Sequence, residues 1–289
     1  MHEMRLKYWK NIVRNVLCTP RPMCYNRPEV IFMTLDRPHA RQAFAEYTSH
    51  YNAADPKVKL KIDHTYRVAA LCERIANSLS LSPQDVDLAW LCGLLHDVGR
   101  FEQLRRYGTF IDAKSIDHAL MSVTVLFEEG RLRDYIAGTD EDALLRTAIR
   151  LHNAYRLPEE MDDRTRMFCQ ILRDADKIDI LRVNVETPME QIYNVSTEAL
   201  RQSPVSPAVL DAFYEHHCVL RTLNHYPADN AVGHASFVFE LCYPKSLRAV
   251  AEQGWLWKLL DFKTENPDTA KAFAGMKAEM QRWLEEHIK

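Results

Sequence analysis

The sequence is poor in the features that mark several protein classes. It has only 8 glycines in 289 residues and no long alternation of apolar and polar residues, so a sheet-rich fold is not expected. Its 7 cysteines are scattered without a CxxC pair, which argues against a disulfide scaffold. Its apolar runs are much shorter than the roughly 20 residues that cross a bilayer. With 37 basic and 40 acidic residues, the net charge of −3 creates no global field for nucleic acid or a membrane surface.

These absences predict a cytoplasmic protein in a reducing compartment. The odd cysteine count and the lack of a signal peptide both support that interpretation. Four cysteines lie in apolar runs, as reduced core thiols do, namely Cys72, Cys92, Cys169 and Cys242. The expected partner is a small molecule, with no nucleic-acid polymer and no membrane, and self-association into a homo-oligomer stays open.

Apolar residues recur at three- and four-residue spacing, which predicts an all-α fold. One such stripe predicts a helix over 64–80, and Ser82 with Pro83 begins the next helix. That second helix is expected to continue through VDLAWLCGLLHDVGR and to stop near Gly99. Further helices are expected over 116–128, closed by Gly130, and over 141–153, 164–184, 189–202, 207–224 and 266–288.

The chain is expected to form one helical domain with extensions at both ends. Residues 1–45 are assigned to an N-terminal arm and a leading helix, residues 46–185 to a helical core, and residues 186–289 to a helical extension packed on that core. Within the core, residues 101–114 are expected to form an irregular, basic and aromatic loop. The segment FVFELCYPKS fits either a short extended piece or another helix.

Five successive helical segments each carry histidine or aspartate at or near one end. These residues are His64, His96 with Asp97, His118, His152 and Asp176. Imidazole and carboxylate together suit divalent iron, manganese, cobalt, nickel or zinc, and the absence of cysteine from the set argues against a structural zinc site. Adjacent helix positions cannot both point at one place, so His96 and Asp97 are expected at a frayed helix end. A single histidine at a helix end is more often a cap or a surface residue, but the whole ordered set predicts a metal centre.

Three strings resemble the motifs of the HD-domain superfamily of metal-dependent phosphohydrolases. HTYRVA is similar to its opening H-S/T-x-x-V helix, LCGLLHDVGR to its central LLHDIGK motif, and RDADKIDIL to its closing D-A-D-K/R-L-D motif. The resemblance covers roughly residues 60–185 and implies an α-helical bundle with the metal held between helix ends. In the closing motif it assigns the ligand role to Asp176 rather than to Asp174.

His118 and His152 extend the pattern to H…HD…H…H…D. This longer pattern resembles superfamily members that bind two metals, with Asp97 as the bridging carboxylate. The implied cofactors are two divalent transition-metal ions, iron or manganese first, with cobalt, nickel or zinc as alternatives. Four histidines and two aspartates leave positions open for water and substrate oxygens, as a catalytic site requires.

The resemblance implies a phosphohydrolase that cleaves a phosphomonoester or phosphodiester with a metal-activated water. The expected substrate is a nucleotide or a related small phosphorylated metabolite. Asp97, Lys177 and Arg67 are expected to act in catalysis, and substrate phosphate is expected to contact Lys177, Arg67, Arg100 and Lys114. The branch that cleaves cyclic dinucleotides carries a Gly-Tyr-Pro signature, which is missing from LHNAYRLPEE here. That substrate is therefore not favoured.

Two other functions stay open at this point. The same ligand set resembles that of HD-type mixed-valent di-iron oxygenases, which act on a small polyol or a phosphonate, and iron suits these ligands as well as manganese does. A catalytically inactive, nucleotide-binding regulatory module is less favoured, because all six ligands are present.

Residues outside this pattern are given structural roles. The aromatic residues Phe101, Tyr107 and Phe110 suit either stacking on a nucleobase or packing of their loop onto the bundle, and packing is favoured. Four histidines of the C-terminal third are interpreted as ordinary helix and loop residues, namely His216, His217, His225 and His234.

Overall fold

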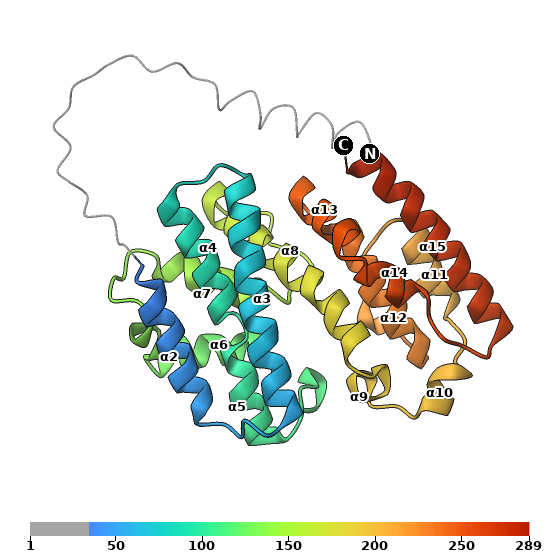
Figure 1. Cartoon of the computed structure of the whole chain (residues 1–289), viewed down its shortest axis with the longest axis horizontal. Helices are drawn as coiled ribbons and strands as arrows, with labels where there is room; N and C mark the ends of the chain where they lie inside the picture. The colour runs from blue at the N-terminus through green and yellow to red at the C-terminus, as the bar shows by residue number, and fades with distance from the viewer. Residues whose placement is uncertain (1–34, 289) are drawn as a thin grey trace, which may run out of the picture. The chain divides into compact units, whose positions relative to one another are not determined.

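The structure, a computed structural model, describes residues 35–288, and all the secondary structure in that part of the chain is helical (Figure 1). The all-α prediction is therefore confirmed. Most of the arm expected within residues 1–45 lies outside the described residues. No helix in the described part is long and apolar enough to cross a membrane.

The α-helices occur in the following order along the chain. They are α2 (Arg37–Ser49), α3 (Pro56–Ser78), α4 (Pro83–Leu95), α5 (Val98–Tyr107), α6 (His118–Val123), α7 (Asp142–Leu151), α8 (Asp163–Glu186), α9 (Met189–Tyr193), α10 (Thr197–Arg201), α11 (Pro207–Tyr214), α12 (Pro227–Ser236), α13 (Pro244–Gln253), α14 (Trp255–Leu260) and α15 (Pro267–His287). Short 3-10 helices are η1 (Asp112–Lys114), η3 (Arg131–Asp134), η4 (Arg221–Leu223) and η5 (Phe237–Glu240). The element η2 (Thr124–Glu128) is a π-helical turn.

Helix α3 begins eight residues earlier than the apolar stripe predicts. Asp55 is its N-cap and accepts a hydrogen bond from the Lys57 amide, and Pro56 occupies the first helical position. Helix α4 begins as predicted, with Ser82 accepting from the Asp85 amide. The early start of α3 places His64 in the interior of the helix rather than at its end.

The second predicted helix is broken at the histidine–aspartate pair. Helix α4 ends at Leu95 and α5 begins at Val98, so the expected helix end at Gly99 is wrong, and so is the expected loop over 101–107. Asp97 has φ −111° and ψ 14°, outside the helical region, and it redirects the chain. The apolar pattern is continuous across this break, which is why periodicity does not reveal it.

Gly99 has a packing role instead of a capping role. A Cβ at this position would lie 2.3 Å from the Ser122 amide nitrogen and 2.6 Å from the carbonyl carbon of Met121 in α6. The Gly99 amide donates to the Ser122 hydroxyl (3.0 Å), which donates to the carbonyl of His96 (2.8 Å). The glycine therefore allows α6 to approach the break between α4 and α5 closely.

Helix α8 is the central packing element. It contacts α3, α4 and α7 on one side and α12, α13 and α14 on the other, and Figure 1 shows it (yellow) running between these two groups. The buried apolar side chains form one continuous cluster that includes Trp90, Phe168 and Phe273. Helices α3 to α8 and the C-terminal extension thus share one hydrophobic core.

Two of the predicted C-terminal helices are interrupted. The helix expected over 189–202 is split into α9 and α10 by Asn194, which adopts a left-handed conformation with φ 55°. The helix expected over 207–224 stops at Tyr214, and His216 then has φ 58°. The ambiguous FVFELCYPKS segment forms the turn η5, then a short extended stretch, then the start of α13.

Core thiols and aromatic residues lie mostly where the sequence places them. Three of the four expected core cysteines are buried as free thiols, and Cys242 is half-buried. Phe101 is buried, with its ring 6.0 Å from that of Phe44 and 5.4 Å from that of Tyr51. This aromatic residue packs α5 onto the bundle, whereas Tyr107 is exposed.

The Gly99 contact predicts that Gly99→Ala destabilises the fold by about 1–3 kcal/mol, because the added methyl overpacks the backbone of α6. Gly233→Ala in α12 is the matched control: a Cβ there would meet no atom within 4 Å, so a gain of up to about 1 kcal/mol is expected from helix propensity. Urea unfolding of both variants measures the difference. Equal midpoints for the two variants would show that the contact is not tight.

Candidate metal centre

The six predicted ligands come from five helices or their ends. His96 and Asp97 lie at the break between α4 and α5, His118 begins α6, and His152 is the C-cap of α7. The expectation of a helix end is wrong for the other two, because His64 lies inside α3 and Asp176 inside α8. These two interior positions meet because α3 packs against α8.

The ligand atoms form two groups that share Asp97. Around its Oδ2 lie the Nε2 atoms of His64 (3.7 Å) and His96 (3.5 Å), and Asp176 Oδ1 is 3.1 Å from His64 Nε2. Around its Oδ1 lie the Nε2 atoms of His118 and His152, each at 3.8 Å. Ligands bonded to one transition metal at about 2.0–2.2 Å lie roughly 3 Å apart, so both groups have spacing close to that of a coordination shell.

The histidines have a defined tautomer. His96 Nδ1 is 2.7 Å from the carbonyl oxygen of Gly93, and His152 Nδ1 is 2.8 Å from that of Ile149. A carbonyl oxygen only accepts, so Nδ1 must carry the proton. Each neutral ring therefore presents the lone pair of Nε2 to the site.

The other two histidines are oriented by carboxylates. His64 Nδ1 donates to Asp179 Oδ2 (2.7 Å), and His118 Nδ1 donates to Asp112 Oδ2 (2.6 Å). Sequence reasoning missed both of these aspartates as site residues, and Asp179 is buried. Its position three residues after Asp176, on the same face of α8, is the signal that was available. Such partners fix the ring orientation of metal-binding histidines.

The residues present fit a divalent cation. His64 Nε2, His96 Nε2 and Asp97 Oδ1 are buried with no hydrogen-bond partner among the described residues. His118 Nε2 faces His152 Nε2 at 3.0 Å, which sets one lone pair against another. Buried acceptors that face each other are costly unless a cation lies between them. Imidazole and carboxylate are the donor set that iron, manganese and zinc accept.

The ionisation states suit this role. Burial lowers the pKa of His118 and of His152 to about 4, which keeps both rings neutral. Burial alone would raise the pKa of Asp97, but Lys61 and the other basic groups nearby hold it well below its usual range. Burial and Lys61 lower the pKa of His64, yet its contacts with Asp176 and Asp179 prevail and raise it. His64 Nε2 therefore lies where a positive charge is favoured.

A cavity of about 330 Å³ opens onto these ligands. Its wall includes Lys177 and Arg100, two of the residues expected to bind substrate phosphate. The other two do not line it: Arg67 donates two hydrogen bonds to Asp179 (2.7 and 3.0 Å), and Lys114 is exposed in η1. Arg67 therefore orients Asp179, the partner of His64, and its contact with substrate stays a prediction.

Sequence reasoning also missed Lys61. Its Nζ lies 2.7 Å from Asp97 Oδ2, and the side chain lines the cavity beside the metal-ligand atoms. The signal was its place on α3, one helical turn before His64. Lys61 thus adds a cation at the metal end of the cavity.

The first aspartate of the closing motif points away from the ligand cluster. Asp174 is buried and accepts from the amides of Cys242 (2.9 Å) and Tyr243 (3.1 Å), and burial raises its pKa to about 6. Asp176, not Asp174, therefore reaches the histidines, while Asp174 fastens the C-terminal extension to α8.

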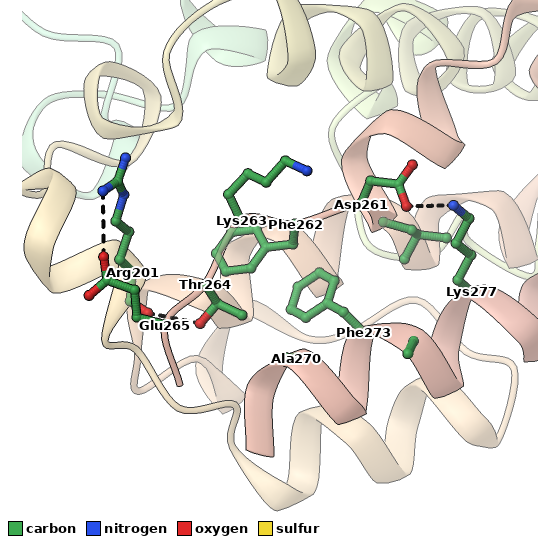
Figure 2. A pocket seen from close by; sticks show the side chains of 11 residues that line it. Arg201, Asp261, Phe262, Lys263, Thr264, Glu265, Ala270, Phe273 and Lys277 are labelled. Atoms are coloured by element: carbon green, nitrogen blue, oxygen red, sulfur yellow. Dashed lines mark hydrogen bonds and ion pairs between the residues drawn. The ribbon is translucent and has the colours of Figure 1, made fainter. Parts of the chain in front are cut away.

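Another hollow, of about 520 Å³, lies at the corner between α14 and α15 and carries no ligand cluster (Figure 2). Four of its charged groups form pairs, since Arg201 pairs with Glu265 and Lys277 pairs with Asp261, and Lys263 also lines the hollow. The C-terminal histidines do not form a metal cluster in the described residues either. His216 pairs with Glu279 instead (2.8 Å).

Comparison with models of protein families identifies the HD domain. The family model for the HD domain matches residues 62–181, the segment that holds all six ligands, so this segment is an HD domain. The resemblance stated for the three motifs is thereby confirmed. No curated protein and no solved structure matches the chain.

The orientation of His64 by Asp179 predicts that Asp179→Ala weakens metal binding by about 10- to 100-fold, because the ring loses its fixed tautomer. Asp163→Ala, at an exposed position in the first turn of α8, is the control and should leave affinity unchanged. Competition of each apoprotein with a metal-binding dye measures the affinities. Equal affinity for the two variants would contradict the orienting role.

Proposed function

From the HD domain over residues 62–181, we propose that the protein is a metal-dependent phosphohydrolase that cleaves a phosphate ester of a nucleotide or a related small metabolite. The observation that carries this proposal is the convergence of four Nε2 lone pairs and two carboxylates at the base of a cavity lined with cations. Such a cavity suits an anionic substrate that reacts at a metal centre.

The two ligand groups favour two ions bridged by Asp97. Oδ2 would share one ion with His64, His96 and Asp176, and Oδ1 would share the other with His118 and His152. Bound divalent ions would supply Lewis-acid polarisation of the phosphate and would acidify the attacking water.

Arg100 is poised for a phosphate oxygen. One terminal nitrogen of its guanidinium donates to Asp112 Oδ1 (2.8 Å), to Gln103 (2.7 Å) and to the carbonyl of Phe110 (2.8 Å). Its Nε is buried, has no hydrogen-bond partner among residues 35–288 and lies 3.7 Å from Asp97 Oδ1, too far for a hydrogen bond. A rigid donor beside the ligand cluster is suited to hold a substrate oxygen there.

Lys61 and Lys177 supply further positive charge around the same space. Lys61 donates a hydrogen bond to Asp97, so its positive charge can offset the negative charge of that carboxylate and of a bound phosphate. Lys177 lines the cavity next to Asp176 in the chain. Lys61 and Arg100, beside the ligand cluster, would stabilise negative charge on the phosphate as it reacts, whereas Lys177 would contact another part of the substrate.

We expect purified protein to contain close to two transition-metal ions per chain and to release phosphate from a panel of nucleotides and sugar phosphates. Asp97→Ala should remove both ions and abolish release, because it deletes the shared ligand. Anaerobic metal analysis with electron paramagnetic resonance, followed by phosphate assay of the same sample, tests this. A mixed-valent di-iron signal without phosphate release would instead identify an oxygenase, and folded protein that takes up neither iron nor manganese would contradict the metal centre itself.

Lys177→Ala should keep the metal content and raise KM at least several-fold, because it removes a substrate contact and no ligand. Lys271→Ala, at an exposed position on α15, serves as the control. Steady-state kinetics with metal analysis of both variants make the comparison. An unchanged KM in Lys177→Ala would contradict its role in substrate binding.

A further inference from the structure

The cavity is completed by residues outside the HD domain. Its far wall is formed by the segment 218–222 and by Phe237, all in the C-terminal extension. The Tyr155 hydroxyl, from the connection between α7 and α8, donates to the carbonyl of Cys218 (3.0 Å) and links this wall to the HD domain. The extension therefore forms part of the wall of this cavity.

The cations around the cavity differ in their partners. At the metal end, Lys61 is paired with Asp97 and Arg100 with Asp112. At the extension end, the side chains of Lys177 and Arg221 make no hydrogen bond or ion pair with any described residue. Two cationic side chains on one cavity wall that form no ion pair within the described residues favour an anion from outside the chain.

The geometry of α8 separates Lys177 from the metal ligands. Neighbouring residues in an α-helix point about 100° apart, so Asp176 and Lys177 face different directions. Asp176 reaches His64, whereas Lys177 Nζ lies 6.0 Å from the ring centre of Phe237 in the extension. The guanidinium of Arg173, on the same helix, donates hydrogen bonds to main-chain carbonyls within residues 151–155. Lys177 and Arg221 are thus the cations left to bind a ligand at this end.

We infer that the substrate carries a second anionic group, held by Lys177 and Arg221, at the end of the molecule opposite the phosphate that reacts. This inference rests on the proposed phosphohydrolase function for the metal end of the site. It adds the requirement that the substrate carry a second anionic group, which the six predicted metal ligands alone do not impose.

The dimensions of the cavity limit the rest of the molecule. About 330 Å³ is at the low end of the roughly 300–1,000 Å³ of ligand sites, so a dinucleotide is too large. Ile180, Val219 and Phe237 present apolar surface along the wall. The substrate class is therefore a small phosphate ester with a second carboxylate or phosphate across a short carbon skeleton or a single ring.

The test measures binding without turnover. Metal-loaded full-length protein is titrated anaerobically, by calorimetry, with ω-phosphonocarboxylates from phosphonoacetate to 6-phosphonohexanoate and with the alkylphosphonates of the same lengths. We expect at least one length to bind about tenfold or more tightly than its singly anionic match, the gain typical of a charge-assisted contact. The corresponding bisphosphonates distinguish a carboxylate from a phosphate as the preferred second group.

Three variants assign the gain to the extension. In Arg221→Gln, the phosphonocarboxylate and the alkylphosphonate of the same length should bind with nearly equal affinity. Arg221→Lys, which keeps the charge, should retain part of the gain in affinity. Arg248→Gln, at an exposed position in α13, is the matched control and should retain all of it. Circular dichroism and melting temperature check that each variant is folded.

The outcomes separate the two proposals. If alkylphosphonates bind to the metal-loaded protein and no second anionic group improves binding at any length, the inference is overturned and the phosphohydrolase function stands. A gain that persists in Arg221→Gln and in Lys177→Met also overturns it. If the protein takes up no metal, or if no phosphonate binds, the proposed function fails and the inference fails with it.

Discussion

The structure depends on one electrostatic constraint: a cluster of buried lone pairs and carboxylates that only a cation can satisfy. Hydrogen bonds through Nδ1 fix the histidines so that all four Nε2 atoms face inward toward Asp97 and Asp176. The local backbone around the cluster brings these side chains together. The chain breaks at 96–97 to present an adjacent pair, and Gly99 allows the helix that carries His118 to come close.

Helix α8 couples this cluster to the rest of the molecule. Three residues of its closing motif have different surroundings. Asp176 lies against the histidines, Asp174 accepts hydrogen bonds from amides of the extension, and Lys177 lines the cavity. Because successive helical residues point about 100° apart, four consecutive positions can serve all three purposes. The extension is therefore fastened to the same helix that supplies a ligand, which explains how it can form a wall of the site.

The sequence predicts the all-α fold and the residues that meet in the buried cluster, because both depend on local pattern: helical spacing and three short motifs around His64, Asp97 and Asp176. It does not predict the break at 96–97, since the apolar run continues across it. It also misses Asp179 and Lys61, whose roles depend on contacts with residues 115 and 36 positions away. Such contacts are set by how α3 packs against α8 and against the break after α4, and no local pattern encodes them.

The central claim is that this cluster of buried acceptors is a metal site. Anomalous diffraction from crystals grown with iron or manganese tests it most directly, with data on both sides of each absorption edge. The account predicts anomalous peaks within bonding distance of the four Nε2 atoms and of both oxygens of Asp97. Absence of any peak, with the histidines hydrogen-bonded to water or to rearranged side chains, would contradict it.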